Sequence, residues 1–171
     1  LQAMVKRKAY SLDSVILNFK EVGCNVSTTS NSVTIAQADK IQPVDMTTAV
    51  YPGFPTDLQA QWVALMTLAK GSSIITDTVY HDRFSHVPAL NRFGANIKVE
   101  NNTAFVRGVD ALVGAPVMST DIRASASLIV AGLAAKGRTE ISRVYHIDRG
   151  YEQIEEKFRS LGANIWRKNP S

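Results

Sequence analysis

Residues 90–97, LNRFGANI, decide the fold, because the chain contains two further versions of them: FKEVGCNV at residues 19–26 and FRSLGANI at residues 158–165. Each version reads as the end of a helix, a glycine, a small residue, an asparagine and a β-branched residue. A glycine just past a helix adopts the left-handed conformation at little energetic cost and is a common helix terminator. The following residues alternate in polarity like a strand. The chain of 171 residues therefore repeats one unit about every 65–70 residues.

The second and third copies agree over a longer stretch. PTDLQAQWVALMTLAKG at residues 55–71 aligns with STDIRASASLIVAGLAAKG at residues 119–137. Each predicts an apolar helix that starts at a threonine or aspartate cap and ends at Lys-Gly. Two strand-like stretches follow, SIITDTVYH at residues 73–81 and RTEISRVYH at residues 138–146.

A second helix and a hairpin complete the unit. In the second copy Pro88 falls in the first turn of this helix, where proline is tolerated. A strand then leads into a hairpin, IKVE-NN-TAFVRG in the second copy and VSTT-SN-SVTIA in the first. In the third copy the apolar residues of the second helix have helical spacing: Tyr151, Ile154, Phe158 and Leu161.

The unit is thus predicted to run helix, strand, helix, strand, strand, with a further strand before the first helix, as in GAPVM at residues 114–118. This is an α/β (α+β) fold of repeated βαβαββ units. The first copy lacks its opening portion, and the third stops at IWRKNPS, where its hairpin should turn. We expect units at about residues 1–50, 51–115 and 116–171, and a fragment whose open edges are completed by something outside it.

The first helix of the third unit is unusually rich in small residues. Small side chains let helices approach closely, so we expect this helix to lie among other helices, with the sheets outside. The alternative is an ordinary helix that contains many good helix formers. The small residues are Ala124, Ser125, Ala126, Ser127, Ala131, Gly132, Ala134 and Ala135.

Composition narrows the class of protein. Hydrophobic residues make up 45% of the chain, which is enough for a sizeable core, and no run of about 18 apolar residues predicts a membrane span. No signal peptide is recognisable, and a single cysteine excludes an internal disulfide and fits a reducing compartment, so we expect a cytoplasmic protein. The net charge of +4 suits an anionic partner, either a phosphate ligand or nucleic acid.

Four stretches, FPTDLQAQ, VYHDRFSHVP, MSTDIRASASL and YHIDRGYEQIEEKFRSLGANI, closely resemble the C-terminal part of the enolpyruvyl transferase family, in particular its members that act on UDP-N-acetylglucosamine. The resemblance begins at about Tyr51 and is weaker before it. It implies a two-domain enzyme in which each domain is an inside-out α/β barrel of three such units, with helices inside and sheets outside. Residues 1–171 would form part of the C-terminal domain, which an N-terminal segment helps to complete.

The resemblance also implies a reaction. An enolpyruvyl group passes from phosphoenolpyruvate to the 3-hydroxyl of UDP-N-acetylglucosamine with release of phosphate, at the first committed step of bacterial peptidoglycan synthesis. It implies no cofactor, no metal, and no nucleic-acid or membrane partner. The missing N-terminal domain would supply a lysine that holds phosphoenolpyruvate and a loop with a reactive cysteine, so we expect the fragment alone to be inactive. Cys24 takes the position of Ala95 and Ala163 in the other copies and is interpreted as a packing residue.

Asp57 is the candidate base. It lies near the start of the helix predicted at residues 55–71, where aspartate is a common cap, and its position alone favours that role. The resemblance implies instead that its carboxylate contacts the sugar 3-hydroxyl and takes part in proton transfer. The two roles are compatible only if one carboxylate oxygen stays free.

Three arginines, Arg83, Arg123 and Arg149, are candidates for an anion clamp. The arginine fork matches carboxylate and phosphate oxygens, and the resemblance implies that Arg149 contacts phosphoenolpyruvate and is needed for turnover. The alternative for Arg149 is a surface ion pair with Asp148 or Glu152. The sequence leaves open which arginine meets the carboxylate and which the phosphate.

Asp121, Val79 and Tyr80 complete the predicted substrate site. We expect Asp121 to cap its helix and to orient Arg123. The resemblance implies that the Val79 backbone and the Tyr80 ring hold the uridine nucleotide, and a ring can stack on a base. The alternative is a tyrosine of the core, which is our expectation for Tyr145.

The three histidines, His81, His86 and His146, lie in predicted turns without the spacing of metal ligands, and we interpret them as polar turn residues or hydrogen-bond partners. Two other functions stay open. One is the related transfer to shikimate 3-phosphate, against which the RASAS and YHIDRGYE stretches argue. The other is an RNA-binding or RNA-processing module, for which the chain offers neither an aromatic RNA-binding motif nor a basic tract.

Overall fold

The second unit shows the complete repeat. The computed structural model describes residues 2–6, 12–36 and 38–168. The sheet of the second unit has the order β4-β5-β7-β6, in which β4 is parallel to β5 and the other neighbours are antiparallel. Its elements are β4 (Met46–Thr48), η2 (Thr56–Leu58), α2 (Gln59–Met66), β5 (Ser72–Asp77), α3 (Val87–Arg92), β6 (Asn96–Glu100) and β7 (Thr103–Arg107).

The first unit contains the second half of the same pattern. Its sheet has the order β1-β3-β2, which matches β5-β7-β6 in the second unit, and α1 corresponds to α3. Among the described residues, this copy contains no counterpart of β4 or α2. The elements are β1 (Gln2–Lys6), α1 (Asp13–Glu21), β2 (Asn25–Thr28) and β3 (Ser32–Ala36).

The third unit contains the first half of the pattern. Strand β8, which was predicted from GAPVM, is parallel to β9, as β4 is to β5. Among the residues that the structure describes, β9 has no strand on its other edge, and residues 164–168 run as coil where β6 stands in the second unit. The elements are β8 (Pro116–Met118), α4 (Ile122–Ala134), β9 (Glu140–Ser142), α5 (Tyr145–Asp148) and α6 (Ile154–Ser160).

The structure corrects several predicted boundaries. Strands β5 and β9 end before the two Val-Tyr-His segments, so residues 79–81 lie in a loop, and Tyr145 begins the single-turn helix α5. The helix predicted from Tyr151 onward begins at Ile154. Neither threonine nor aspartate caps α2, because a 3-10 turn precedes it and its N-cap is Leu58.

The glycine in each copy of the repeated motif has the left-handed backbone conformation that the sequence predicts. Gly23, Gly94 and Gly162 have φ angles of 101°, 84° and 90°. A side chain in this left-handed region would be strained, so each glycine lets the chain reverse from a helix toward the next extended segment. The repeat is thus set locally at these turns.

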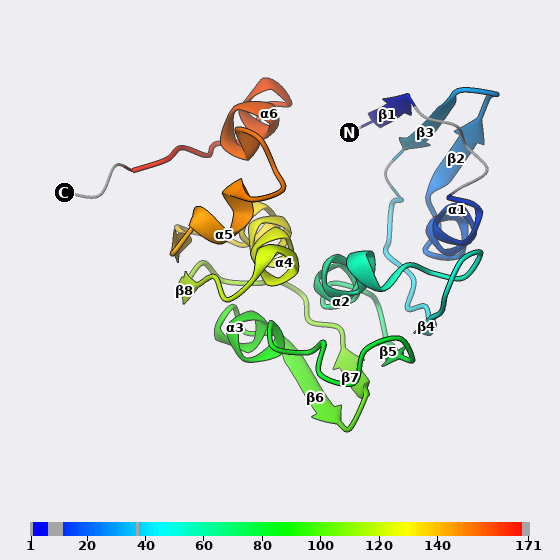
Figure 1. Cartoon of the computed structure of the whole chain (residues 1–171), viewed down its shortest axis with the longest axis horizontal. Helices are drawn as coiled ribbons and strands as arrows, with labels where there is room; N and C mark the ends of the chain where they lie inside the picture. The colour runs from blue at the N-terminus through cyan, green and yellow to red at the C-terminus, as the bar shows by residue number, and fades with distance from the viewer. Residues whose placement is uncertain (1, 7–11, 37, 169–171) are drawn as a thin grey trace.

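Helices lie inside and sheets outside, as predicted. Figure 1 shows α2 and α4 side by side in the middle of the molecule, with the strands arranged around them. In β7, Ala104 and Val106 point to the core while Phe105 between them is 41% exposed, the alternation of a sheet with one covered face. The same core contains Trp62 of α2 and Leu128 of α4.

The small-residue face of α4 is buried, which confirms the predicted place of this helix. Ser125, Ser127 and Ala131 are at most 1% exposed, and α4 packs closely on α2. Ala134 is exposed and lies outside this face. Cys24 is partly buried against the main core, in agreement with a packing role.

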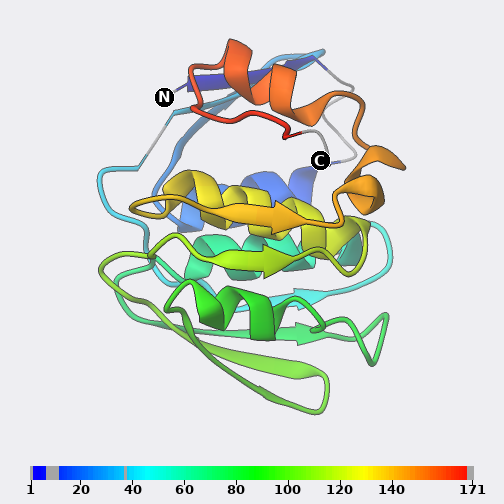
Figure 2. The same cartoon turned by 90° about the vertical axis from the view of Figure 1, so that its left-hand side faces the viewer.

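Strands of two units end at one edge of the molecule. In Figure 2 the strands β8 and β9 point to the right-hand side, where α5 follows β9. The loop after β5 and the N-terminus of α4 lie at the same edge, because parallel strands present their carboxyl ends together. Among the described residues, no helix has the length and apolar character that crossing a membrane requires.

Candidate active site

Asp57 forms an ion pair with Arg123 from the next unit. In the 3-10 turn before α2, its Oδ1 lies 2.6 Å from Nε of Arg123 and 3.8 Å from Nη1 of Arg83. Both contacts use the same oxygen, and the Asp57 side chain is 67% exposed. The helix-cap interpretation is therefore wrong in this structure, since α2 has no side-chain cap. The second oxygen, Oδ2, faces no arginine in these contacts.

Arg83 is held under an aromatic ring. Its guanidinium carbon lies 4.1 Å from the centre of the Tyr80 ring, a cation–π contact, and its side chain is only 12% exposed. Tyr80 itself is 56% exposed, so the core interpretation of this tyrosine is wrong. The same prediction is wrong for Tyr145, which is 52% exposed. Arg83 therefore contributes a fixed positive charge beside Asp57.

Arg123 starts from a capped helix end. Asp121 is the N-cap of α4, and its Oδ1 accepts hydrogen bonds from the backbone N–H groups of Arg123 at 2.8 Å and Ala124 at 3.0 Å. Its Oδ2 accepts a hydrogen bond from Ser85 at 3.2 Å, which joins the loop of Arg83 to the helix of Arg123. Burial would raise the pKa of Asp121, but these hydrogen bonds, with a further one from Thr120, lower it. The predicted cap is confirmed.

Asp77 holds the loop of Val79 and Tyr80, the two residues predicted to contact the nucleotide. Asp77 was not identified as a site residue from the sequence. It is fully buried at the end of β5, where its Oδ1 accepts hydrogen bonds from the backbone N–H groups of Val79 at 2.9 Å and Tyr80 at 2.8 Å. Thr56, the neighbour of Asp57, donates to its Oδ2 at 2.7 Å. Burial would raise the pKa of Asp77, but the hydrogen bonds outweigh it and the pKa is lowered. The inward period-two position of Asp77 in β5 was the available signal.

His86 is buried in the turn before α3 and forms a hydrogen bond with the Arg83 backbone, in agreement with its interpretation as a turn residue or hydrogen-bond partner. It is 2% exposed, stacks near Phe84, and has no partner for Nε2. Burial lowers its pKa to about 4, although the charge of Asp121 and a hydrogen bond to the Arg83 backbone act in the opposite direction. The imidazole is therefore neutral near pH 7.

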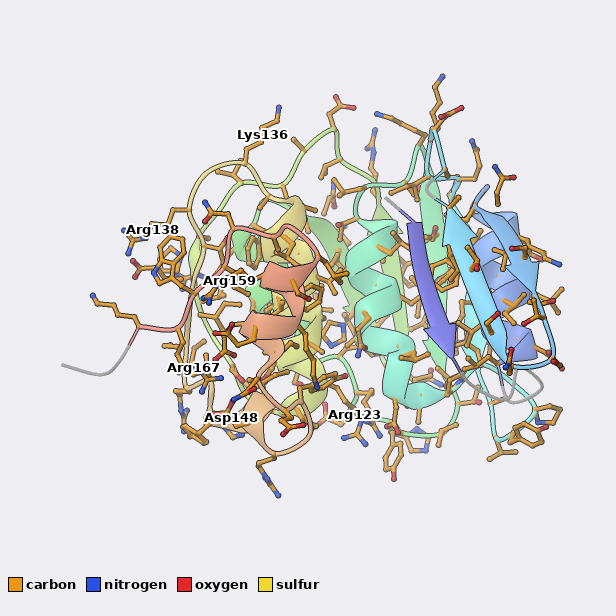
Figure 3. The ribbon with its side chains drawn as sticks, turned by 90° about the horizontal axis from the view of Figure 1, so that it is seen from above. Arg123, Lys136, Arg138, Asp148, Arg159 and Arg167 are labelled. Atoms are coloured by element: carbon orange, nitrogen blue, oxygen red, sulfur yellow. The ribbon has the colours of Figure 1, made fainter. Side chains whose placement is uncertain are left out.

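Arg149 stands on the last turn before α6. It is the C-cap residue of α5 and its side chain is exposed. Gly150 packs against Ile122, the residue before Arg123, so closely that an added Cβ would collide with the end of the isoleucine side chain. Figure 3 shows Asp148, the neighbour of Arg149, at the same end of the molecule as Arg123. Of the two carboxylates named as alternative partners of Arg149, Asp148 and Glu152, the first pairs with Arg167 instead.

We call Asp57, Arg83, Arg123 and Arg149 the arginine rim. Their loops come from the second and third units and open on one edge of the fold. Guanidinium groups offer forked hydrogen bonds to carboxylate and phosphate, and a carboxylate with a free oxygen can accept a proton. Among the described residues, no three His, Cys, Asp or Glu side chains come together as metal ligands would. The rim is suited to an anionic substrate that reacts by proton transfer.

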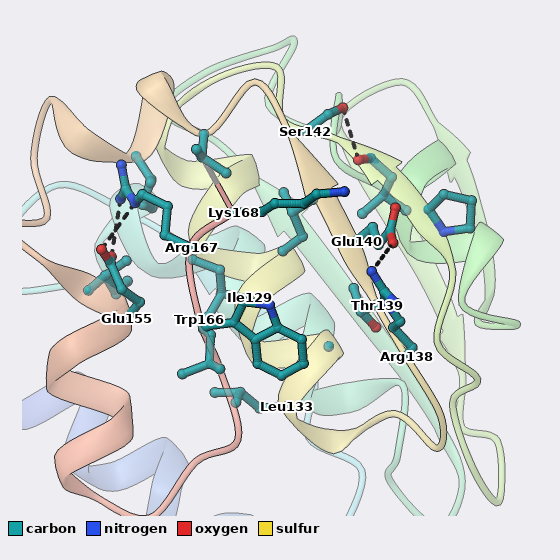
Figure 4. A pocket seen from close by; sticks show the side chains of 18 of the residues that line it. Ile129, Leu133, Arg138, Thr139, Glu140, Ser142, Glu155, Trp166, Arg167 and Lys168 are labelled. Carbon is teal, nitrogen blue, oxygen red and sulfur yellow. Dashed lines mark hydrogen bonds and ion pairs between the residues drawn. The ribbon is translucent and has the colours of Figure 1, made fainter. Parts of the chain in front are cut away.

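A groove opens beside the third unit, away from the ion pairs of Asp57. It has a volume of about 670 Å³ and lies between the free edge of β9 and residues 164–168, over Ile129 and Leu133 of α4. Figure 4 shows Trp166 across this groove from Arg138 and Glu140. By its place in the repeat, the groove corresponds to the position of β7 in the second unit.

Comparisons with known proteins place this arrangement in a family. The family model for EPSP synthase (3-phosphoshikimate 1-carboxyvinyltransferase) matches residues 6–158. UDP-N-acetylglucosamine 1-carboxyvinyltransferases from Chlorobium chlorochromatii and Chloroherpeton thalassium are 57% and 59% identical, each over 157 residues and 92% of this chain. The chain spans 37% of the length of both relatives.

Solved structures agree. The enolpyruvyl transferase NikO from Streptomyces tendae superposes with a TM-score of 0.86 at 28% identity, over 96% of this chain and 40% of that one. EPSP synthase from Acinetobacter baumannii gives a TM-score of 0.69 at 15% identity, over 98% of this chain and 40% of that one, which is a likeness of fold.

The repeated units with helices inside and sheets outside thus define the class, a domain of the enolpyruvyl transferase type. Members of this class are carboxyvinyl-transferring enzymes by name. The chain belongs to the EPSP synthase (3-phosphoshikimate 1-carboxyvinyltransferase) family.

Proposed function

We propose that this chain is part of an enzyme that transfers the enolpyruvyl group of phosphoenolpyruvate to the 3-hydroxyl of UDP-N-acetylglucosamine and releases phosphate. The observation that carries the proposal is the pairing of Asp57 with Arg123 and Arg83 at one rim. The names of relatives that are 57% and 59% identical support UDP-N-acetylglucosamine as the acceptor. The reaction would make this a peptidoglycan enzyme of the cytoplasm.

The reaction explains why a carboxylate and arginines would share the rim. Phosphoenolpyruvate carries a carboxylate and a phosphate, and Arg83, Arg123 and Arg149 supply the opposite charges. Asp57 then accepts the proton of the sugar 3-hydroxyl as the sugar oxygen bonds to the central carbon of phosphoenolpyruvate, while the methylene carbon gains a proton from an acid supplied by the rest of the enzyme. The resulting tetrahedral intermediate loses phosphate together with a proton from its methyl group, which restores the double bond of the enolpyruvyl group. The substrate anion competes for Arg123, so substrate binding frees Asp57 for this role.

The nucleotide would lie along the loop after β5. The Val79 N–H already donates to Asp77, which fixes the loop and directs the contact with the nucleotide to other groups of residues 79 and 80. The Tyr80 ring is exposed on one side and stacks on Arg83 on the other. It is thus able to stack on a base while it steadies the arginine.

The rest of the polypeptide would complete both the site and the fold. The chain spans 37% of the length of its relatives, which leaves room for a second domain that would carry the lysine and the cysteine loop. The groove between β9 and residues 164–168 lies where β7 stands in the second unit. We propose that the N-terminal segment of the full-length protein seats there and pairs with the free edge of β9.

Phosphate release by the full-length protein tests the proposal. We expect release from phosphoenolpyruvate with UDP-N-acetylglucosamine as the acceptor and none above background with shikimate 3-phosphate. Faster release with shikimate 3-phosphate would assign the acceptor to the rival reaction. Binding to RNA, measured over a range of salt concentrations, with no response to UDP-N-acetylglucosamine would reject the enzyme proposal.

A further inference from the structure

The turn that carries Arg149 is anchored to α4 by its apolar residues, whereas Arg149 itself is exposed. Helix α5 is four residues long, and Ile147 is its one buried residue. Its C-terminal end is closed by backbone hydrogen bonds from Gly150 and Tyr151 to the Ile147 carbonyl, at 3.1 and 2.9 Å. Such a short helix is not stable by itself, so side-chain contacts have to fix the direction in which Arg149 points.

Arg167 spans this turn from the coil after α6. Its Nη1 and Nη2 donate to the two carboxylate oxygens of Asp148, at 2.8 and 2.6 Å. Its Nε lies 3.0 Å from Oε1 of Glu155, and Nη2 donates to Oε2 of Glu155 at 3.1 Å. Asp148 directly precedes Arg149, and Glu155 lies in the first turn of α6. One guanidinium therefore joins both sides of the turn (Figures 3 and 4).

The three charged groups support one another. Hydrogen bonds from Arg167 are the main cause that lowers the pKa of Asp148. A hydrogen bond to its own backbone N–H, together with Arg167, lowers the pKa of Glu155, and the two carboxylates raise the pKa of Arg167. Isolated surface ion pairs contribute little, but a forked arginine between two carboxylates fixes geometry as well as charge. Glu155 is only 16% exposed in this network.

The network also engages the carboxylate of Asp148, which would otherwise compete with the substrate for Arg149. Asp148 is adjacent to Arg149 in sequence, and a free carboxylate there is able to pair with the Arg149 guanidinium. Both oxygens of Asp148 are used by Arg167, so Arg149 is left available for an anion from outside. Arg167 thus holds the turn and keeps Asp148 away from Arg149.

We propose that Arg167 is a positioning residue for Arg149, and the proposal rests on the proposed function of the arginine rim. Removing the fork releases the turn and frees Asp148 to bind Arg149. The effect should fall on phosphoenolpyruvate, which Arg149 is proposed to contact, and should spare UDP-N-acetylglucosamine, which lies against the loop after β5.

Kinetics of the full-length enzyme test this assignment. We expect Arg167→Gln to raise KM for phosphoenolpyruvate about 10- to 100-fold, the size typical of a displaced binding group, with KM for UDP-N-acetylglucosamine within about twofold. Arg167→Lys, which keeps the charge but loses the fork, should fall between Arg167→Gln and the wild type. Lys70→Gln is the matched control, because Lys70 is an exposed cation that pairs with Asp110, outside both the rim and the groove beside β9, and its loss should leave both KM values unchanged.

A second substitution separates positioning from simple stabilisation. Asp148→Asn removes the competing carboxylate, so Arg167→Gln/Asp148→Asn should recover part of the phosphoenolpyruvate affinity that Arg167→Gln loses. Equal losses for both substrates, or no recovery in the double variant, would overturn the inference. A normal KM for Arg167→Gln beside a raised KM for Arg149→Ala would overturn it and leave the proposed function standing. Normal kinetics of Arg149→Ala would instead reject the proposed role of Arg149.

Discussion

Single residues of the rim take roles that their neighbours in the sequence do not suggest. Asp57 looks like a helix cap, yet its carboxylate pairs with Arg123, 66 residues away. Arg83 is almost buried and stacks on Tyr80, whereas Arg149 is exposed and has its neighbour Asp148 occupied by Arg167. These contacts prepare one fixed and one freely accessible guanidinium for an anionic substrate.

Arg149 should matter most for turnover. In the full-length enzyme we expect Arg149→Ala to lower kcat/KM for phosphoenolpyruvate by about 100- to 1000-fold, because it removes a forked charge contact from the reacting group. Steady-state kinetics with phosphate detection measures the change, and circular dichroism checks that the fold is kept. The matched control is Lys70→Ala, which removes an exposed cation that pairs with Asp110 and has no contact with the rim. Equal kinetics of Arg149→Ala and the wild type would contradict the assignment.

His86 should make stability depend on pH in a defined window. Its pKa is about 4 in the folded protein and about 6.5 when unfolded, so only the unfolded chain gains a proton between these values. The free energy of unfolding should therefore be highest above pH 6.5 and fall by about 3 kcal/mol by pH 4, at about 1.4 kcal/mol per pKa unit. Asp77 and Asp121, whose pKa values are lowered from 3.8, act mainly below this window, whereas Glu155, whose pKa is lowered from 4.5, adds to the fall at its acid end.

Urea unfolding at several pH values measures this dependence. In His86→Gln the slope between pH 6.5 and pH 4 should be clearly smaller than in the wild type. An unchanged slope would show that another group is responsible.

At the level of elements, the close contact between α4 and the turn after α5 sets the two arginine loops against each other. An added Cβ at Gly150 would collide with Cδ1 of Ile122, while the next nearest atom, Cγ1, is 3.5 Å away. Among the described residues, the only close approach to Gly150 is therefore by the terminal methyl group of Ile122. It links the backbone beside Arg149 to the residue before Arg123.

Gly150→Ala should consequently impair the enzyme, and Ile122→Val should relieve it. We expect Gly150→Ala to raise KM for phosphoenolpyruvate about tenfold or more, because a displacement of the turn moves Arg149. Ile122→Val removes Cδ1, so the double variant Gly150→Ala/Ile122→Val should return most of the lost affinity. Loss of activity without recovery in the double variant would mean that a side chain at residue 150 is harmful for a reason other than its contact with Ile122.

Local signals predicted the elements well, and contacts between units escaped prediction. Nearby residues or the spacing of residue types were enough to predict three features. These are the glycines with positive φ, the hairpin at residues 96–107 and the buried small-residue face of α4. The short helix α5 was predicted as strand because Val-Tyr-His favours extended structure, and its place against α4 decides otherwise. The burial of His86 and the Asp57–Arg123 pair depend on tertiary contacts, which no local pattern encodes.

At the level of the whole molecule, one half of the repeat stands at each end of the chain and the complete unit lies between them. The first unit has strands that match β5, β7 and β6, and the third has those that match β4 and β5. The groove beside β9 marks the place where the third unit is open among the described residues. The rim is built by the second and third units, at the edge where their parallel strands end.

This chain expressed by itself should therefore release no phosphate from phosphoenolpyruvate and UDP-N-acetylglucosamine. The physical reason is that the proposed lysine and cysteine loop are supplied by the rest of the polypeptide. A coupled phosphate assay on the isolated chain and on the full-length protein, at equal concentrations, makes the comparison. Turnover by the isolated chain at the full-length rate would show that the rim alone performs the reaction.

The most direct measurement is the rate of phosphate release by full-length Asp57→Asn at saturating phosphoenolpyruvate and UDP-N-acetylglucosamine. Asparagine keeps the size and much of the hydrogen bonding of Asp57 but cannot take up the hydroxyl proton. We predict that kcat falls by about 100- to 10,000-fold, as expected when a general base is lost, while both substrates still bind. A kcat within a fewfold of the wild type would contradict the claim that the rim holds the base of the reaction.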